Sequence, residues 1–166
     1  MMVTHLSPPN RRVVLRPAAA GAAFSGLEAC AASLRVFTMV ANRGRRLCSC
    51  CHGWTTLMQR SARFNATVRD EADMSAPTRR LGVPDDLASC HTVEVEGYVI
   101  EGRVPPEDIV RSLEQRPTGV RGLAVPGMPI GSPGMERTGG GRDACDVIAF
   151  RDDGGRDVFT HYPALS

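Results

Sequence analysis

Two hydrophobic patterns divide the chain into strands and helices. Apolar residues, many of them β-branched, alternate with polar ones in four stretches, and this alternation predicts strands. The four stretches are residues 34–40, 65–70, 92–95 and 98–104. Elsewhere the apolar residues recur at helical spacing, as Trp54, Leu57 and Met58 do within 53–64. Helices are also expected over 74–81, before Gly82, and from Pro105 through Leu113.

The predicted elements follow one another as strand, helix, strand, helix, hairpin and helix. A tight turn at Glu96-Gly97 joins the two strands of the hairpin. This order is that of a thioredoxin-like α/β domain. In such a domain the turn before the first helix lies against the loop that enters the third strand.

Glycine and proline dominate residues 117–141, which we expect to form one long loop. A loop of this length is usually functional or disordered. After it, alternation resumes in residues 145–150 and 157–162, on either side of Asp152-Asp153-Gly154-Gly155. The pattern predicts a C-terminal β-hairpin. Residues 34–166 are therefore expected to form one domain.

Residues 1–33 do not show the pattern of a fold. Asn10–Arg16 resembles a twin-arginine export signal, because a basic segment precedes the mild apolar stretch of residues 18–27. Ala29-Cys30-Ala31 is a candidate cleavage site. This interpretation predicts a periplasmic protein. The alternative is a disordered or spuriously extended N-terminus.

Composition excludes several classes of partner. A net charge of +2, from 20 basic and 18 acidic residues, makes no basic stripe for nucleic acid. Aromatic residues make up 5% of the chain, too few for a base-stacking surface. No apolar run is long enough to span a membrane.

Four cysteines carry the candidate chemistry. Cys48, Cys50 and Cys51 lie within four residues of one another, at or just before the start of the predicted first helix. The unpaired N–H groups of a helix N-terminus stabilise a thiolate over a thiol. Cys90 lies on the loop that enters the third predicted strand. The thioredoxin-like order would therefore bring four sulfurs into one pocket.

Thiolates support either metal binding or disulfide exchange. Cys48 and Cys51 have the Cys-x-x-Cys spacing of a thiol–disulfide oxidoreductase, but Cys50 has no part in that mechanism. Several close thiolates suit a multinuclear Cu(I) cluster, in which each sulfur bridges two ions. Zinc prefers four tetrahedral ligands, and the spacing matches no usual iron–sulfur pattern. We therefore favour a copper-binding protein over an enzyme, with thiol–disulfide exchange and a zinc-stabilised module as alternatives.

Three further residues are candidate auxiliary ligands. His91 directly follows Cys90 and could bind metal or orient the sulfur. Met128 and Met135 offer thioethers in the long loop, where they could hold Cu(I) in passing. Methionine also fills gaps in apolar cores, and this alternative stays open.

Together these motifs resemble the CopG-type copper-resistance proteins of the bacterial cell envelope. The matching stretches are Cys48-Ser49-Cys50-Cys51 with Trp54, Gly82-Val83-Pro84, Ser89-Cys90-His91-Thr92, Gly97–Gly102 with Val104-Pro105, Gly122–Pro129 and Gly131–Glu136. The resemblance implies a thioredoxin-like fold, a periplasmic location and a copper–thiolate cluster. It implies the ligands Cys48, Cys50, Cys51 and Cys90, with copper ions and other envelope copper-handling proteins as partners.

The resemblance suggests a role in copper resistance, including a change in the oxidation state of copper. Three features depart from the family pattern. Ser49 replaces a glycine, Arg103 replaces a histidine whose metal or proton role would be lost here, and the loop of residues 41–47 before Cys48 is longer.

Overall fold

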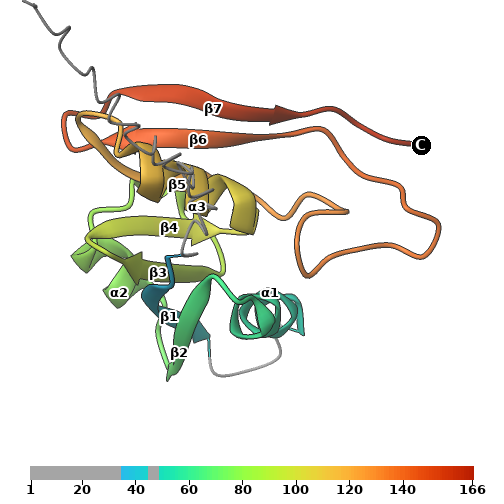
Figure 1. The fold of residues 1–166 in the computed structure, drawn as a ribbon, viewed down its shortest axis with the longest axis horizontal. Coiled ribbons are helices and arrows are strands. Elements are labelled where there is room, and N and C mark those ends of the chain that lie inside the picture. The colour runs from blue at the N-terminus through green and yellow to red at the C-terminus, as the bar shows by residue number, and fades with distance from the viewer. Residues whose placement is uncertain (1–34, 45–48) are drawn as a thin grey trace, which may run out of the picture. The chain divides into compact units, whose positions relative to one another are not determined.

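The computed structural model describes residues 35–44 and 49–166, which lie within one compact unit of residues 33–166. In these residues seven strands form a single mixed sheet, and three α-helices lie beside it (Figure 1). The elements are β1 (Phe37–Gly44), α1 (Ser49–Arg60), β2 (Phe64–Glu71), α2 (Ser75–Arg80), the 3₁₀ turn η1 (Asp85–Leu87), β3 (His91–Val95), β4 (Tyr98–Gly102), α3 (Pro106–Gln115), β5 (Val120–Val125), β6 (Cys145–Arg151) and β7 (Arg156–Tyr162).

The strands lie in the order β2-β1-β3-β4-β5-β6-β7. The pairs β1–β2 and β4–β5 are parallel, and the other four pairs are antiparallel. The mixed α/β class and the predicted succession of strands and helices up to α3 are confirmed. So is the terminal hairpin of β6 and β7.

Side chains of the inner strands alternate between two apolar clusters on opposite faces of the sheet. Ile100 joins the cluster that contains Trp54 of α1 and Ile109 of α3. Its neighbour Val99 joins the smaller cluster with Leu81, just beyond α2. Successive residues of a strand point to opposite faces. α1 and α3 therefore cover one face, and the α2–η1 segment covers the other.

The expectation of one loop over residues 117–141 is wrong, because β5 lies within it. Val120–Val125 pairs with β4 and β6, and its last four residues are buried. Gly122 interrupts the apolar pattern, and the sheet requires it there. A Cβ at this position would lie 2.0 Å from the Val99 carbonyl oxygen. The remaining loop, residues 126–144, connects β5 to β6.

Two boundaries also differ from expectation. β1 continues through Gly44, so residues 41–44 of the expected loop belong to the strand. Polar Asn42 is buried there, and its amide donates to the Thr92 carbonyl of β3. α1 begins at Ser49 rather than at residue 53. Cys50 and Cys51 therefore lie inside the first helical turn.

Asp108 ties α3 to the terminal hairpin. Its side chain is 4% exposed and accepts hydrogen bonds from Arg111 at 2.8 Å, Thr160 at 2.7 Å and the Tyr162 hydroxyl at 2.8 Å. Burial and the bond to Asp108 raise the pKa of Tyr162. Asp108 therefore fixes the position of β7 at the edge of the sheet.

Candidate metal centre

Three sulfur atoms from two distant segments meet at the start of α1. The sulfurs of Cys50, Cys51 and Cys90 all lie within 4.8 Å of one another. Cys51 is buried, whereas Cys50 and Cys90 are partly exposed. Cys48, the fourth expected ligand, lies outside the described residues. The predicted convergence of Cys90 on the cysteine-rich turn is therefore seen for the three described sulfurs.

The helix and the sheet together create this meeting point. Cys50 and Cys51 lie in the first turn of α1, which contains no acidic residue to oppose a thiolate. β1 pairs with β3 in a register that places Arg43 opposite His91. The Arg43 side chain also lies 3.2 Å from the Thr55 hydroxyl of α1. This register brings Cys90, the residue before β3, to the helix, where its carbonyl oxygen lies 3.5 Å from the Cys51 sulfur.

The Cys51 sulfur is in a disulfide bond in this structure. A disulfide sulfur carries no thiolate charge, and thiolates are the form that binds metal. Cys51 must therefore be reduced before it can become a ligand.

His91 lies beneath the thiol cluster and is fully buried. Its Nδ1 is 3.4 Å from the Cys90 sulfur, and its ring centroid is 4.6 Å from that of Trp54. Burial, followed by the charge of Arg103, lowers the pKa of His91 to about 3. The imidazole is therefore neutral at physiological pH, which is the form that can bind metal or orient a sulfur.

Arg103 is the residue at this site that the sequence analysis undervalued. Its side chain is 0% exposed, and Nη2 lies 3.6 Å from the Cys90 sulfur. Burial raises the pKa of Cys90, and the Arg103 charge opposes that rise. The sequence contained a signal, because an arginine flanked by Gly102 and Val104-Pro105 stands in a largely apolar run. We expected a lost function there, but the structure places a positive charge beside a candidate ligand.

Glu101 anchors the segment that carries Cys90. It is fully buried on β4 and accepts a hydrogen bond from the Ser89 backbone N–H at 2.5 Å. Burial raises the pKa of Glu101 to about 7. The Ser89 hydroxyl donates to the Gly127 carbonyl at 3.3 Å, so the long loop contacts the same segment.

The loop also packs on the start of α1. Gly134 has a φ of +83°, and a Cβ there would lie 2.6 Å from the Trp54 nitrogen and 2.8 Å from the Cys50 carbonyl oxygen. Only a glycine permits this close approach. Met135 directly follows Gly134, which packs on the start of α1. Met128 directly follows Gly127, which accepts the hydrogen bond from Ser89 next to Cys90. Met128 is 58% exposed and Met135 is partly buried, and their role as ligands stays a prediction.

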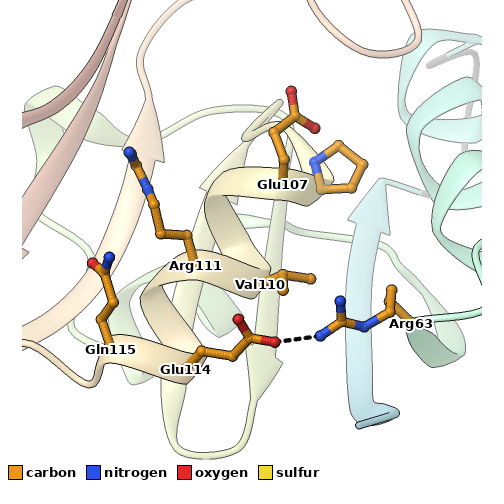
Figure 2. A pocket seen from close by; sticks show the side chains of 7 residues that line it. Arg63, Glu107, Val110, Arg111, Glu114 and Gln115 are labelled. Atoms are coloured by element: carbon orange, nitrogen blue, oxygen red, sulfur yellow. Dashed lines mark hydrogen bonds and ion pairs between the residues drawn. The ribbon is translucent and has the colours of Figure 1, made fainter. Parts of the chain in front are cut away.

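A hollow of ≈480 Å³ on the outer side of α3 has different chemistry (Figure 2). Arg63 and Glu114 form an ion pair of 2.6 Å across it, and Val110 contributes an apolar side chain. None of the described residues that line this hollow is a cysteine, methionine or histidine. It therefore has none of the soft donors found in the thiol cluster.

The chain is similar to one protein-family model and to two solved structures. A family model described as a protein of unknown function, DUF411, matches residues 87–135, which include Cys90. A search of curated proteins gave no match. Two solved structures, named Copper resistance protein copG, Form 1 and Form 2, are each 38% identical to the chain with a TM-score of 0.70. Each match covers 78% of this chain. It covers 99% of the Form 1 chain and 100% of the Form 2 chain.

The chain belongs to the CopG family. The family predicted from the cysteine, glycine and proline motifs is therefore confirmed. The aligned share of the chain is close in size to the unit of residues 33–166. In the described part of this CopG-family chain, no helix is both long and apolar enough to cross a membrane.

Proposed function

We propose that this chain binds Cu(I) through the thiolates of Cys48, Cys50, Cys51 and Cys90 and serves in copper resistance. The observation that carries the proposal is the meeting of three sulfurs within 4.8 Å at the start of α1. Two sulfurs bonded to the same ion at about 2.3 Å each lie no more than roughly 4.6 Å apart. A small movement of the described thiols, once reduced, is enough to let them share copper ions.

The choice of copper rests on the ligands and on the family. Thiolates are soft ligands and favour Cu(I). The two similar solved proteins are named for copper resistance. Neutral His91 and the buried Arg103 offer support beside Cys90, the first as a ligand or orienting group and the second as a balancing charge. A cluster of several copper ions fits four closely spaced thiolates better than a single ion does.

The strand arrangement supports a thioredoxin-like core. Strands β2-β1-β3-β4 form one half of the sheet, in which β2 and β1 are parallel, whereas the pairs β1–β3 and β3–β4 are antiparallel. α1 and α3 pack on one face of this half and the α2–η1 segment on the other. In this interpretation β5, β6 and β7 are additions to the core.

We further propose that the protein works in the periplasm with other copper-handling proteins of the cell envelope. The supporting sequence is the twin-arginine pattern around Arg11-Arg12, which lies outside the described residues. The test is to express the full chain and ask which cell fraction contains it, with Arg11→Ala/Arg12→Ala as the matched variant. Loss of the periplasmic fraction in the variant is expected. An equal distribution of both proteins would contradict export by this route.

A metal count tests copper binding itself. The full chain is reduced, loaded with Cu(I) under anaerobic conditions and freed of excess metal. We expect more than one copper per chain, and a clear fall in that number for Cys90→Ser. Cys145→Ser is the matched control, because Cys145 lies outside the group of three sulfurs. One copper or less per chain, unchanged in Cys90→Ser, would refute the cluster.

Thiol–disulfide exchange is the second candidate function, because the Cys51 sulfur is already in a disulfide. Exchange through Cys48 and Cys51 would reduce a substrate disulfide without metal, as a thiolate attacks it and the second thiol resolves the mixed disulfide. Turnover by the copper-free protein, lost in Cys51→Ser and inhibited by Cu(I), would favour this function. No turnover by the copper-free, reduced protein would remove it.

A further inference from the structure

Arg103, whose guanidinium contacts the Cys90 sulfur, also lines a second cavity. Its volume is ≈320 Å³, at the lower end of the range for pockets that hold small molecules. The start of α3, the loop of residues 126–144 and the last strand contribute to its walls. The lining residues that matter here are Arg103, Pro105, Ser132, Arg142, Cys145 and Tyr162.

Arg103 brings unsatisfied donors to this cavity. One of its nitrogens, Nη2, contacts the Cys90 sulfur, while Nε and Nη1 have no hydrogen-bond partner among the described residues. The side chain is 0% exposed, so bulk water does not solvate these groups. Buried guanidinium N–H groups are unfavourable unless an acceptor pairs with them, and a carboxylate matches their planar fork. The cavity therefore has the recognition element for an anion in its buried wall.

Arg142 adds a second, fixed positive charge. Its Nε and Nη2 donate to the Pro163 carbonyl at 3.1 and 3.0 Å, and its guanidinium lies 5.3 Å from the ring centroid of Tyr162. Two acids, Glu107 and Glu136, also line the cavity, but both are exposed. Glu136 accepts from the Gly134 N–H at 2.8 Å. Glu107 and Glu136 are therefore exposed members of the lining, whereas Arg103 is a buried one.

We propose that this cavity binds a small carboxylate, whose oxygens accept the free N–H groups of Arg103. Apolar side chains such as Pro105 and Tyr162 suit the carbon skeleton of such a ligand. The site lies beyond the copper function and does not depend on it, because none of these contacts needs a metal. Since the same guanidinium contacts Cys90, an occupant would share the Arg103 charge with that sulfur.

Cys145 supplies a reporter within the cavity. Its thiol is free and partly exposed, so a neutral alkylating reagent can reach it. The experiment uses the copper-free, reduced full chain and measures the rate of iodoacetamide modification at Cys145 by peptide mass spectrometry. Succinate is the probe, and chloride at the same ionic strength is the reference. We expect succinate to slow the modification of Cys145 at least fivefold. Sulfate should need a much higher concentration to give the same protection.

Three variants distinguish specific binding of succinate in the cavity from a general effect of removing a positive charge. Arg103→Gln should remove the protection by succinate, and Arg142→Gln should weaken it severalfold. Arg80→Gln changes an exposed arginine at the end of α2 and should leave protection intact. Equal rates in succinate and chloride, equal protection by sulfate, or protection that survives in Arg103→Gln would each overturn the proposal.

A spectroscopic measurement on the unmodified chain covers the case in which Arg103→Gln does not fold. The Nε–H NMR signal of Arg103, assigned by through-bond experiments on the parent chain, should shift in proportion to bound succinate. A signal that does not move at concentrations protecting Cys145 would overturn the assignment to Arg103. Copper binding could fail every test above and leave these outcomes unchanged.

Discussion

Gly134→Ala tests whether the long loop holds the start of α1. The new Cβ would lie 2.6 Å from the Trp54 nitrogen and 2.8 Å from the Cys50 carbonyl oxygen, closer than real Cβ atoms approach backbone. Neither of these atoms can move without disturbing the first turns of the helix. The loop must therefore shift away from the cysteines.

The magnitude has two parts. A non-glycine residue at a φ of +83° costs roughly 1–2 kcal/mol, because the left-handed region crowds the Cβ. Forcing extra atoms into a packed contact costs about 1–3 kcal/mol more. Gly140→Ala is the matched control, since Gly140 has a φ of +78° but no atom of the described chain within 4 Å of its Cβ position. The difference between the two variants isolates the contact with α1.

Urea unfolding, followed by circular dichroism, measures the effect on stability. With a slope of about 2 kcal/mol per molar urea, Gly134→Ala should lower the midpoint by roughly 1–2.5 M and Gly140→Ala by roughly 0.5–1 M. Because the Cys50 turn loses its cover, Gly134→Ala should also weaken Cu(I) retention against a competing chelator, whereas Gly140→Ala should not. Equal midpoints for the two variants would refute the packing of Gly134 on α1.

Three further predictions concern the buried polar groups and the thiols. Asp108→Asn should lower the free energy of unfolding by about 2–3 kcal/mol in urea titrations, because it removes a buried charge that accepts three hydrogen bonds. Glu114→Gln, in the more exposed pair with Arg63, should change it by less than about 1 kcal/mol, and equal effects would contradict the role of Asp108. The pKa of Glu101 is raised from 4.5 to about 7 in the folded state, so the folded chain holds this proton more tightly than the unfolded chain does. The free energy of unfolding is therefore highest below pH 4.5, and this stability is lost as the pH rises through 7. Glu101→Gln should therefore gain stability relative to the parent chain between pH 5 and pH 8, by up to about 3 kcal/mol, and a pH-independent difference would refute the burial of a proton there. Finally, Cu(I) loading of the reduced protein should release protons, measured with an indicator dye near pH 7, and no release would contradict thiolate ligands.

The sequence predicted best those features that depend on local pattern. The tight turn expected at Glu96-Gly97 joins β3 and β4, and the structure gives both of its residues a positive φ. The order of elements placed Cys90 opposite the turn of Cys50 and Cys51, and the structure brings these sulfurs together. The site was predictable because topology alone decides which loop faces the start of the first helix.

β5 and Arg103 were missed for a common reason, which is that their environments are set by distant parts of the chain. β5 contains Gly122, which weakens a strand signal, yet pairing on both sides stabilises it. Arg103 carries a charge, and charged residues are usually found at the surface, so the residue type alone predicts an exposed side chain. In the structure it is buried beside the Cys90 sulfur, a contact that no local pattern around residue 103 indicates.

The pairing of β1 with β3 makes the proposed Cu(I) site depend on folding. From β3 onward every strand pairs with its neighbour in sequence, so this register is what closes the 39-residue separation between Cys51 and Cys90. An unfolded chain has no such meeting of sulfurs. Under the proposed Cu(I) binding, occupancy and folding would form one coupled equilibrium, and the melting temperature would be a titratable measure of free metal.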